Sequence, residues 1–142
     1  MEQYFALLRQ CPLFQGISPQ ELSQMLPCLG TRHMQVKKHQ MIFRAGDPAR
    51  WVGLVLSGAV HVIQEDYYGN RSIVSTFQPP QLFGEAFACA GVASLPVSVE
   101  AAQDSTLLLL DCQRVIRTCS DACAFHQRLL SNLLHVVAAK NL

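Results

Sequence analysis

Apolar side chains in the first thirty residues recur at the spacing of amphipathic helices. The segment 4–11 carries this pattern and predicts one short helix. A second helix is predicted to begin at Pro19, because Ser18 suits the N-cap position and Glu21, three residues later, can complete a capping box. Gly30 is expected to end this second helix. The chain therefore opens with two helices.

From residue 31 the pattern changes to short runs separated by Gly, Pro and Asn, which is typical of β-strands. Strands are predicted around 34–36 and 41–43 and over 52–56, 59–64, 71–77, 97–102 and 106–111. The pair Ser57 and Gly58 is interpreted as a tight hairpin turn between two of them. About eight short strands with frequent turns predict a closed or nearly closed antiparallel barrel, such as a jelly roll.

A mostly apolar interruption separates two of these strands and organises the rest of the chain. Within the segment 82–101, Gly84 and Glu85 open a short apolar turn, and Gly91 and Pro96 punctuate a loop. Ordinary connections are polar and about 4–6 residues long, whereas this one is about ten residues and apolar. The segment is therefore expected to fold inward and enclose something. A helical cap that fills its own core is the alternative.

Helical spacing returns after the last strand. One short helix is predicted over 113–119, and a second is predicted to follow a cap at Ser120 or Asp121. The second helix carries one apolar stripe, formed by Ala122, Phe125, Leu129, Leu130, Leu133, Val136 and Val137. Two interpretations of the stripe stay open: it packs back on the barrel, or Leu129, Leu133 and Val137 form a dimer interface. The helix reaches the last residue without a stop signal, so we expect it to continue in a longer protein.

Length and composition fit one folded domain. The chain has 142 residues, of which 50% are hydrophobic and 15% are charged, which excludes disorder. We divide it into N-terminal helices (1–30), a β-roll (31–112) with a cassette at 83–98, and C-terminal helices (113–142). The net charge of +1 offers no basic excess for binding DNA phosphates.

The sequence predicts a cytoplasmic protein. Its longest near-continuous apolar run, 51–63, is shorter than the roughly 20 residues that cross a bilayer, and the N-terminus does not resemble a signal peptide. The six cysteines are therefore expected to be mostly reduced, and their spacings match no CxxC pair. A thiol switch between Cys119 and Cys123 is an alternative to the simpler interpretation of both as small buried residues.

Catalysis is not predicted. The sequence has no GxSxG elbow, no paired-carboxylate pocket and no phosphate loop. A metal site of the cupin type needs a second histidine close to the first, and His61 is followed by valine and isoleucine instead. We therefore assign no catalytic residue and no metal ligand.

The order of these elements resembles the sensor domain of the Crp/Fnr family of bacterial transcription regulators, which is the cyclic-nucleotide-binding fold. The matching motifs cover almost the whole chain in the right order: Cys11-Pro12-Leu13-Phe14, Gly46-Asp47, Leu54-Val55-Leu56-Ser57-Gly58-Ala59-Val60, Phe83-Gly84-Glu85 and Val99-Glu100-Ala101. The resemblance implies a double-stranded β-roll flanked by helices and a long final helix through which two subunits pair. It also implies a helix-turn-helix DNA-binding domain, which would lie beyond Leu142.

The resemblance also indicates which residues would touch a ligand. In members that bind cyclic nucleotides, the glutamate of the cassette holds a ribose hydroxyl, and an arginine followed by a small hydroxyl residue neutralises the phosphate. Here Leu95 occupies the arginine position and Pro96 the hydroxyl position. A desolvated phosphate without its cation costs several kcal/mol, and Glu85 adds a like charge. Tight binding of cAMP or cGMP is therefore not expected.

An apolar pocket with one acceptor is expected instead, suited to a small apolar or aromatic effector, unless the side chains close on themselves. The predicted ligand-binding residues are Gly84, Glu85, Ala86, Phe87, Leu95, Pro96 and Val97, with Val137 and Asn141 of the final helix. No cofactor is predicted. The family resemblance leaves a haem or thiol-based sensor as an alternative, in which the possible haem ligands are the four methionines and His33, His39, His61, His126 and His135. An iron–sulfur cluster is not expected, because the N-terminal region holds only Cys11 and Cys28.

Overall fold

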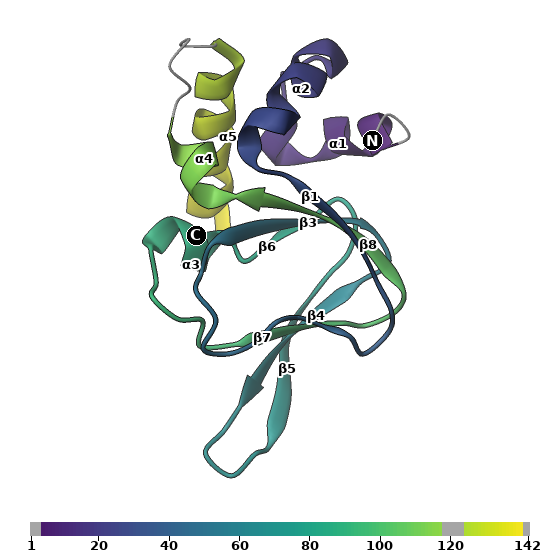
Figure 1. Ribbon diagram of the computed structural model, residues 1–142, viewed down its shortest axis with the longest axis vertical. Helices are drawn as coiled ribbons and strands as arrows, with labels where there is room; N and C mark the ends of the chain where they lie inside the picture. Colours follow the sequence, from purple (N-terminus) through teal and green to yellow (C-terminus); the bar gives the residue numbers. More distant parts are fainter. Residues whose placement is uncertain (1–3, 118–123, 141–142) are drawn as a thin grey trace.

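The computed structural model of the chain describes residues 4–117 and 124–140. Within these residues, eight strands form a β-roll, and helices gather above one of its two sheets (Figure 1). The helices are α1 (Phe5–Gln10), η2 (Pro12–Phe14), α2 (Pro19–Met25), η3 (Leu26–Leu29), α3 (Glu85–Ala90), α4 (Cys112–Ile116) and α5 (Ala124–Lys140). The strands are β1 (Arg32–Val36), β2 (Met41–Phe43), β3 (Trp51–Ser57), β4 (Val60–Glu65), β5 (Arg71–Phe77), β6 (Leu82–Phe83), β7 (Ser98–Ala101) and β8 (Ser105–Asp111).

The eight strands divide equally between two antiparallel sheets. One sheet has the order β1-β8-β3-β6 and the other β2-β7-β4-β5. In Figure 1 the first sheet lies beneath the helices and the second lies below it, with the β4–β5 hairpin reaching furthest from the helices. The predicted β-roll with flanking helices is therefore confirmed.

The turn at Gly58 has a different role from the one expected from the sequence. Strand β3 belongs to the first sheet and β4 to the second, so the two strands do not pair and the predicted tight hairpin is wrong. Gly58 has φ +84°, and a Cβ there would lie 2.2 Å from the hydroxyl of Ser105. That hydroxyl accepts a hydrogen bond from the Ala59 N–H at 3.0 Å. The glycine is therefore the corner at which the chain crosses between sheets.

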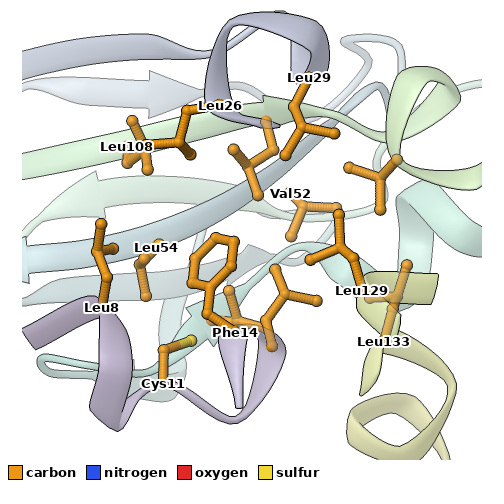
Figure 2. Close-up of a cluster of buried hydrophobic side chains, with 14 of the residues drawn as sticks. Leu8, Cys11, Phe14, Leu26, Leu29, Val52, Leu54, Leu108, Leu129 and Leu133 are labelled. Atoms are coloured by element: carbon orange, nitrogen blue, oxygen red, sulfur yellow. The ribbon is translucent and has the colours of Figure 1, made fainter. Parts of the chain in front are cut away.

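The first sheet is apolar on both faces, which explains the unbroken leucine run in β8. Successive side chains of a strand point to opposite faces. Leu108 and Leu110 join a cluster with the helices, whereas Leu107 and Leu109 point into the roll. Figure 2 shows the helix-side cluster, in which Leu8, Phe14, Val52, Leu54, Leu108 and Leu129 meet. One strand thus contributes to two hydrophobic cores.

Local sequence signals place the N-terminal helices. Ser18 accepts a hydrogen bond from the Glu21 N–H, and the Glu21 carboxylate accepts one from the Ser18 N–H, each at 3.2 Å. This is the predicted capping box, and Pro19 takes the first helical position. The last turn of this region is the 3₁₀ helix η3, which ends at Gly30 as expected.

The final helix α5 lies against the N-terminal segment η2. Leu129 and Leu133 are 0% and 3% exposed and pack in the helix-side cluster. Asn132 donates hydrogen bonds to the carbonyl oxygens of Leu13 and Gln15, both at 2.9 Å. At these positions the stripe packs back on the same chain, so Leu129 and Leu133 are not available for the dimer interface that was one of the two interpretations. Among the described residues, no helix is both long and apolar enough to span a membrane.

Several predicted features fall outside the described residues. They are the candidate caps Ser120 and Asp121, the cysteines Cys119 and Cys123, Ala122 of the apolar stripe and Asn141 of the predicted ligand site.

Candidate functional site

The cassette folds as a short helix set between the roll and the helical layer. After β6 the chain enters α3, whose Glu85 and Ala88 are buried on the side of the helices. Gly84 and Phe87 lie on the other side, at the roll interior. Residues three apart share one face of a helix, so α3 contributes to both cores at once. The cassette therefore contains the short helix that was considered as an alternative.

A small cavity lies inside the roll, behind the cassette. It is lined by Phe43, Pro48, Ala49, Arg50, Trp51, Val62, Gly84, Phe87, Leu95, Val97 and Val99. The free space between these side chains is about 20 Å³, enough for about one water molecule. Almost all of the lining is apolar. The roll interior is therefore filled largely by its own side chains.

The structure brings together some of the predicted ligand residues and separates others. Gly84, Phe87, Leu95 and Val97 line the cavity. Ala86 and Pro96 are exposed instead and are not among the lining residues. Val137 lies further off, in a groove beside α5.

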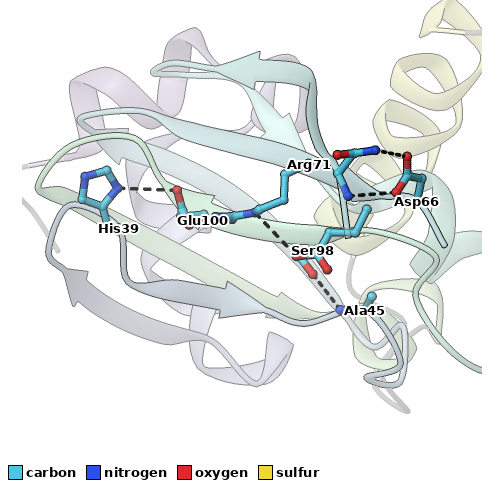
Figure 3. Close-up of polar contacts among 8 residues, drawn as sticks. His39, Ala45, Asp66, Arg71, Ser98 and Glu100 are labelled. Carbon is cyan, nitrogen blue, oxygen red and sulfur yellow. Dashed lines mark hydrogen bonds and ion pairs between the residues drawn. The ribbon is translucent and has the colours of Figure 1, made fainter. Parts of the chain in front are cut away.

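Backbone hydrogen bonds hold Leu95 in the cavity wall. Its N–H donates to the carbonyl of Asp47 at 2.8 Å, and its carbonyl accepts from the N–H of Gly46 at 2.9 Å. The N–H of Ala45 donates to the hydroxyl of Ser98 at 2.9 Å, which ties the same turn to β7 (Figure 3). The side chain of Leu95 is thus held at the roll interior.

Glu85 is buried, but it faces the helices. Its side chain is 3% exposed, and Oε1 accepts a hydrogen bond from Nζ of Lys140 in the last turn of α5. Lys140 also donates to the carbonyl of Leu82 at 3.0 Å. Oε2 of Glu85 has no hydrogen-bond partner among the described residues. The structure therefore places this carboxylate as a link between the cassette and α5, and not among the cavity's lining residues where the sequence predicted it.

The cation nearest the cavity is Arg50, which sequence reasoning missed. Its Nη2 and Nε donate to Oδ2 of Asp111 at 3.0 and 3.2 Å. Its guanidinium also lies 4.8 Å from the ring centroid of Trp51. Asp111 is buried and caps α4 by accepting from the N–H of Gln113. The charge of Arg50 is thus already matched by a carboxylate of the same chain.

Polar contacts on the outside of the second sheet form a separate group (Figure 3). Nη2 of Arg71 donates to Oε2 of Glu100 at 2.9 Å, and Nδ1 of His39 lies 3.6 Å from Oε1 of Glu100. The hydrogen bond from Arg71, helped by its charge and by His39, lowers the pKa of Glu100 from its ordinary value. These residues join β5 to β7 but do not reach the cavity.

Three of the histidines considered as haem ligands make contacts outside the cavity. His33 contacts the ring of Tyr4, His39 is beside Glu100, and Nδ1 of His61 is 3.0 Å from the hydroxyl of Thr76. Neither a histidine nor a methionine is among the residues that line the cavity. Within the described part of the chain, no group of three or more His, Cys, Asp and Glu residues is placed to hold a metal ion.

An open apolar groove of about 490 Å³ runs beside α5. Its lining is Cys89, Ile116, Gln127, Leu130, Ser131, Leu133, Leu134 and Val137. Leu134 is 71% exposed, although it is a large hydrophobic residue. Of the three residues predicted for a dimer interface, Val137 lines this groove and is only partly buried. Leu130 and Leu134 were not assigned to that interface from the sequence.

Comparisons with known proteins agree with this geometry. A family model described as cyclic nucleotide-binding domain matches residues 33–121. No curated protein matches the sequence at a significant level. The catabolite activator protein of Thermus thermophilus is similar in structure, with TM-score 0.70 and 25% identity over 92% of this chain and 57% of that one.

Two further solved structures share the fold. The sensor domain of the transcriptional regulator DNR from Pseudomonas aeruginosa has TM-score 0.75 and 21% identity, over 98% of this chain and 86% of that one. A regulatory subunit of a cAMP-independent protein kinase A from Trypanosoma brucei has TM-score 0.74 and 19% identity, over 98% of this chain and 46% of that one. That subunit is a triple mutant bound to cAMP in its A site. The present chain thus spans about half of the length of two of these proteins.

Proposed function

This chain belongs to the cyclic nucleotide-binding domain family, and we propose that it is the effector-sensing module of a Crp/Fnr-type transcription regulator that does not respond to cAMP. The observation that carries the proposal is the filled roll interior. Ligand pockets for small molecules usually measure roughly 300–1,000 Å³. The cavity here is about 20 Å³, and Leu95, Val97 and Phe87 occupy the space behind the cassette.

The charges around the cavity support the same proposal. The cassette, residues 83–98, contains no lysine or arginine. Arg50 does line the cavity, but using it for a phosphate would take it from Asp111, whose side chain is only 8% exposed. A buried carboxylate that loses its partner is strongly destabilising, so this exchange opposes binding. A cyclic phosphate would therefore find no free cation at this wall.

The trypanosomal subunit supports the idea that this fold can serve without cAMP. It is described as part of a cAMP-independent kinase, and its cAMP-bound form carries three substitutions, one of which introduces an arginine. In the present chain Leu95 lies in the cavity wall, and we infer that cAMP binding would likewise depend on an arginine there.

A small apolar or aromatic effector fits the lining best. Phe43, Phe87, Leu95, Val97 and Val99 offer apolar contact, and Arg50 is the one charged side chain at the wall. Entry of such a molecule requires these side chains to move apart, since the present space holds about one water molecule. The ligand-free state would then be the closed form.

We also propose that two copies of the chain pair through the groove beside α5. Leu134 is exposed there next to Leu130 and Val137, and the family resemblance assigns subunit pairing to the final helix. The link between Glu85 and Lys140 supports a route from the cassette to that helix. A ligand that displaces α3 would change the end of α5 and thereby favour one pairing of the two helices. DNA binding would need a separate domain.

Isothermal titration calorimetry tests the nucleotide part of the proposal. We expect no saturable heat when cAMP or cGMP is titrated to about 1 mM. A phosphate without its cation loses several kcal/mol of binding free energy. Each 1.4 kcal/mol lost weakens binding tenfold. Saturable binding of either nucleotide at low micromolar concentration would refute it.

A thermal-shift screen with small aromatic acids tests the effector. A compound that raises the melting temperature should lose its effect in Leu95→Arg, which alters the cavity wall. It should keep its effect in Pro96→Ser, because the neighbouring Pro96 is exposed outside the cavity. Equal loss in both variants would place the binding site elsewhere.

Light scattering tests the pairing. Leu134→Glu should convert a dimer to a monomer, since a charge in the core of an interface is costly. Ile73→Glu, at an exposed apolar residue of β5, is the matched control and should leave the dimer intact. A wild-type chain that stays monomeric at high concentration would overturn this part of the proposal.

A further inference from the structure

Two cysteine sulfur atoms meet where the cassette touches the C-terminal helices. Cys89 lies in α3, and Cys112 is the first residue of α4. Their Sγ atoms are 3.9 Å apart, although the residues are separated by 23 positions in the sequence. No spacing motif announces this pair, because the fold alone brings α3 and α4 into contact.

We propose that Cys89 and Cys112 form a reversible dithiol–disulfide pair whose oxidation ties the cassette helix to α4. A disulfide has an S–S distance of about 2.05 Å, so the two sulfur atoms must approach by about 2 Å. Rotation of the side chains, with a small shift of α3 toward α4, supplies a movement of this size. The pair lies outside the cavity inside the roll, and its formation requires no effector.

The two thiols differ in a way that assigns their roles. Cys89 is only partly buried and lines the open groove beside α5, whereas Cys112 is 1% exposed. In the unpaired chain a dissolved oxidant therefore reaches Cys89 first, whereas the proposed pairing through this groove would cover it. Cys112 has access to Cys89 but little access to solvent, which suits a resolving thiol.

The electrostatics agree with this order. The hydrogen bond from Cys112 lowers the pKa of the Cys89 thiol from its ordinary value. The same contact, together with burial, raises the pKa of Cys112. Cys11 is a useful contrast, because burial raises the pKa of its thiol to about 11 and keeps it in the unreactive protonated form.

A peroxide is the class of oxidant that this arrangement accepts. The Cys89 thiolate attacks one peroxide oxygen, the O–O bond breaks, and water and a sulfenic acid on Cys89 are formed. Cys112 then attacks the sulfenic sulfur, the S–S bond forms, the S–O bond breaks, and a second water leaves. In total, two thiols and one hydrogen peroxide give one disulfide and two waters. A small dithiol returns both cysteines to the reduced state and is itself oxidised to a disulfide.

Oxidation would fix a part of the molecule that the proposed function requires to move. Helix α3 carries Phe87 of the cavity wall and Glu85 of the link to α5. A disulfide from Cys89 to the start of α4 holds this helix against the C-terminal layer. The oxidised domain would therefore resist opening of the cassette.

Peptide mass analysis tests the pair directly on the whole chain. The sequence has no lysine or arginine between Arg71 and Arg114, so trypsin releases residues 72–114 as one peptide that contains Cys89, Cys112 and no other cysteine. After treatment with hydrogen peroxide and alkylation of the remaining thiols, we expect this peptide to be about 2 Da lighter than its unalkylated reduced form. A glutamate-specific protease cuts this peptide after Glu85 and Glu100, and the fragments 86–100 and 101–114 should stay joined until a reductant is added.

Thermal melting gives a second readout. The disulfide closes the chain between positions 89 and 112, and we expect it to raise the melting temperature by about 5–10 °C. Cys89→Ser should abolish both the mass change and the thermal shift. The matched control Cys28→Ser removes an exposed cysteine and should leave both unchanged.

Two results would overturn the proposal, and both come from the wild-type chain. One is a peptide 72–114 that gains oxygen at Cys89 without ever losing about 2 Da, which would mean that Cys112 does not resolve the sulfenic acid. The other is a disulfide that joins either cysteine to a different residue or to a second chain. Neither result would bear on cAMP binding, so the two proposals fail separately.

Discussion

The ion pair between the cassette and the last helix gives a prediction that can be worked out from the structure. Lys140→Met removes the ammonium group that contacts Oε1 of Glu85. The carboxylate is 3% exposed, and its Oε2 already lacks a hydrogen-bond partner among the described residues. Removing one partner of a buried ion pair costs about 3–5 kcal/mol. Because the Lys140 side chain is 42% exposed, water screens part of the effect, and we expect a loss of about 2 kcal/mol.

Urea unfolding measures this loss. With a slope of about 2 kcal/mol per M, the midpoint of Lys140→Met should fall by about 1 M. Glu85→Gln, which keeps the shape of the side chain, completes a double-mutant cycle with it. The cycle separates the ion pair from the other contacts of Lys140, which include the carbonyl of Leu82 and the ring of Phe77. We expect a coupling free energy of about 1–2 kcal/mol.

The control is Lys37→Met, at an exposed lysine in the connection after β1, which should change the free energy of unfolding by less than about 0.5 kcal/mol. The reasoning would be refuted if the costs of Lys140→Met and Glu85→Gln simply added in the double variant. Additive costs would mean that the two side chains do not interact in solution and that the cassette is not linked to α5 in this way.

Three further predictions concern other parts of the roll. Gly53→Ala should cost about 1–3 kcal/mol in urea unfolding, because its new Cβ would lie 2.2 Å from the ring of Phe83. Leu95→Ala should cost about 2–5 kcal/mol and enlarge the cavity, so that a small apolar probe such as indole should raise the melting temperature more in this variant than in wild type. The pKa of Glu100 is lowered by Arg71, so its stabilisation is present above the unfolded pKa of about 4 and is lost as the pH falls through the folded value. The free energy of unfolding should therefore fall less between pH 5 and pH 2 in Arg71→Met than in wild type. The difference should be less than about 1 kcal/mol, since Arg71 is 47% exposed.

The parts of the fold that depend on residues close together in the sequence were predictable. The capping box at Ser18 joins groups only three residues apart, so its composition is sufficient to place it. The turn at Gly58 is different, because a glycine after an apolar run looks the same whether the next strand joins the same sheet or the other one. Long-range pairing of β3 with β8 and of β4 with β7 decides between them, and this pairing has no local signal.

The candidate site shows the same division. The positions of Leu95 and Phe87 follow from the cassette's motif, and both line the cavity. The direction of Glu85 depends on how α3 rests between two cores, and Lys140 reaches it from a position 55 residues away. Arg50 lies in the loop directly before β3, which carries no motif, so only the folded chain brings it to the cavity wall. An apolar stripe on a helix likewise indicates that a face is covered, but not what covers it, as Leu129 shows.

The sole tryptophan of the chain, Trp51, lies in the cavity wall, and the guanidinium groups of Arg32 and Arg50 are each 4.8 Å from its ring centroid. Indole emission depends on its surroundings, so any molecule that enters the roll and displaces either arginine should shift the fluorescence spectrum. The protein thus carries an intrinsic optical reporter at its candidate binding site, and occupancy can be followed without attaching a dye.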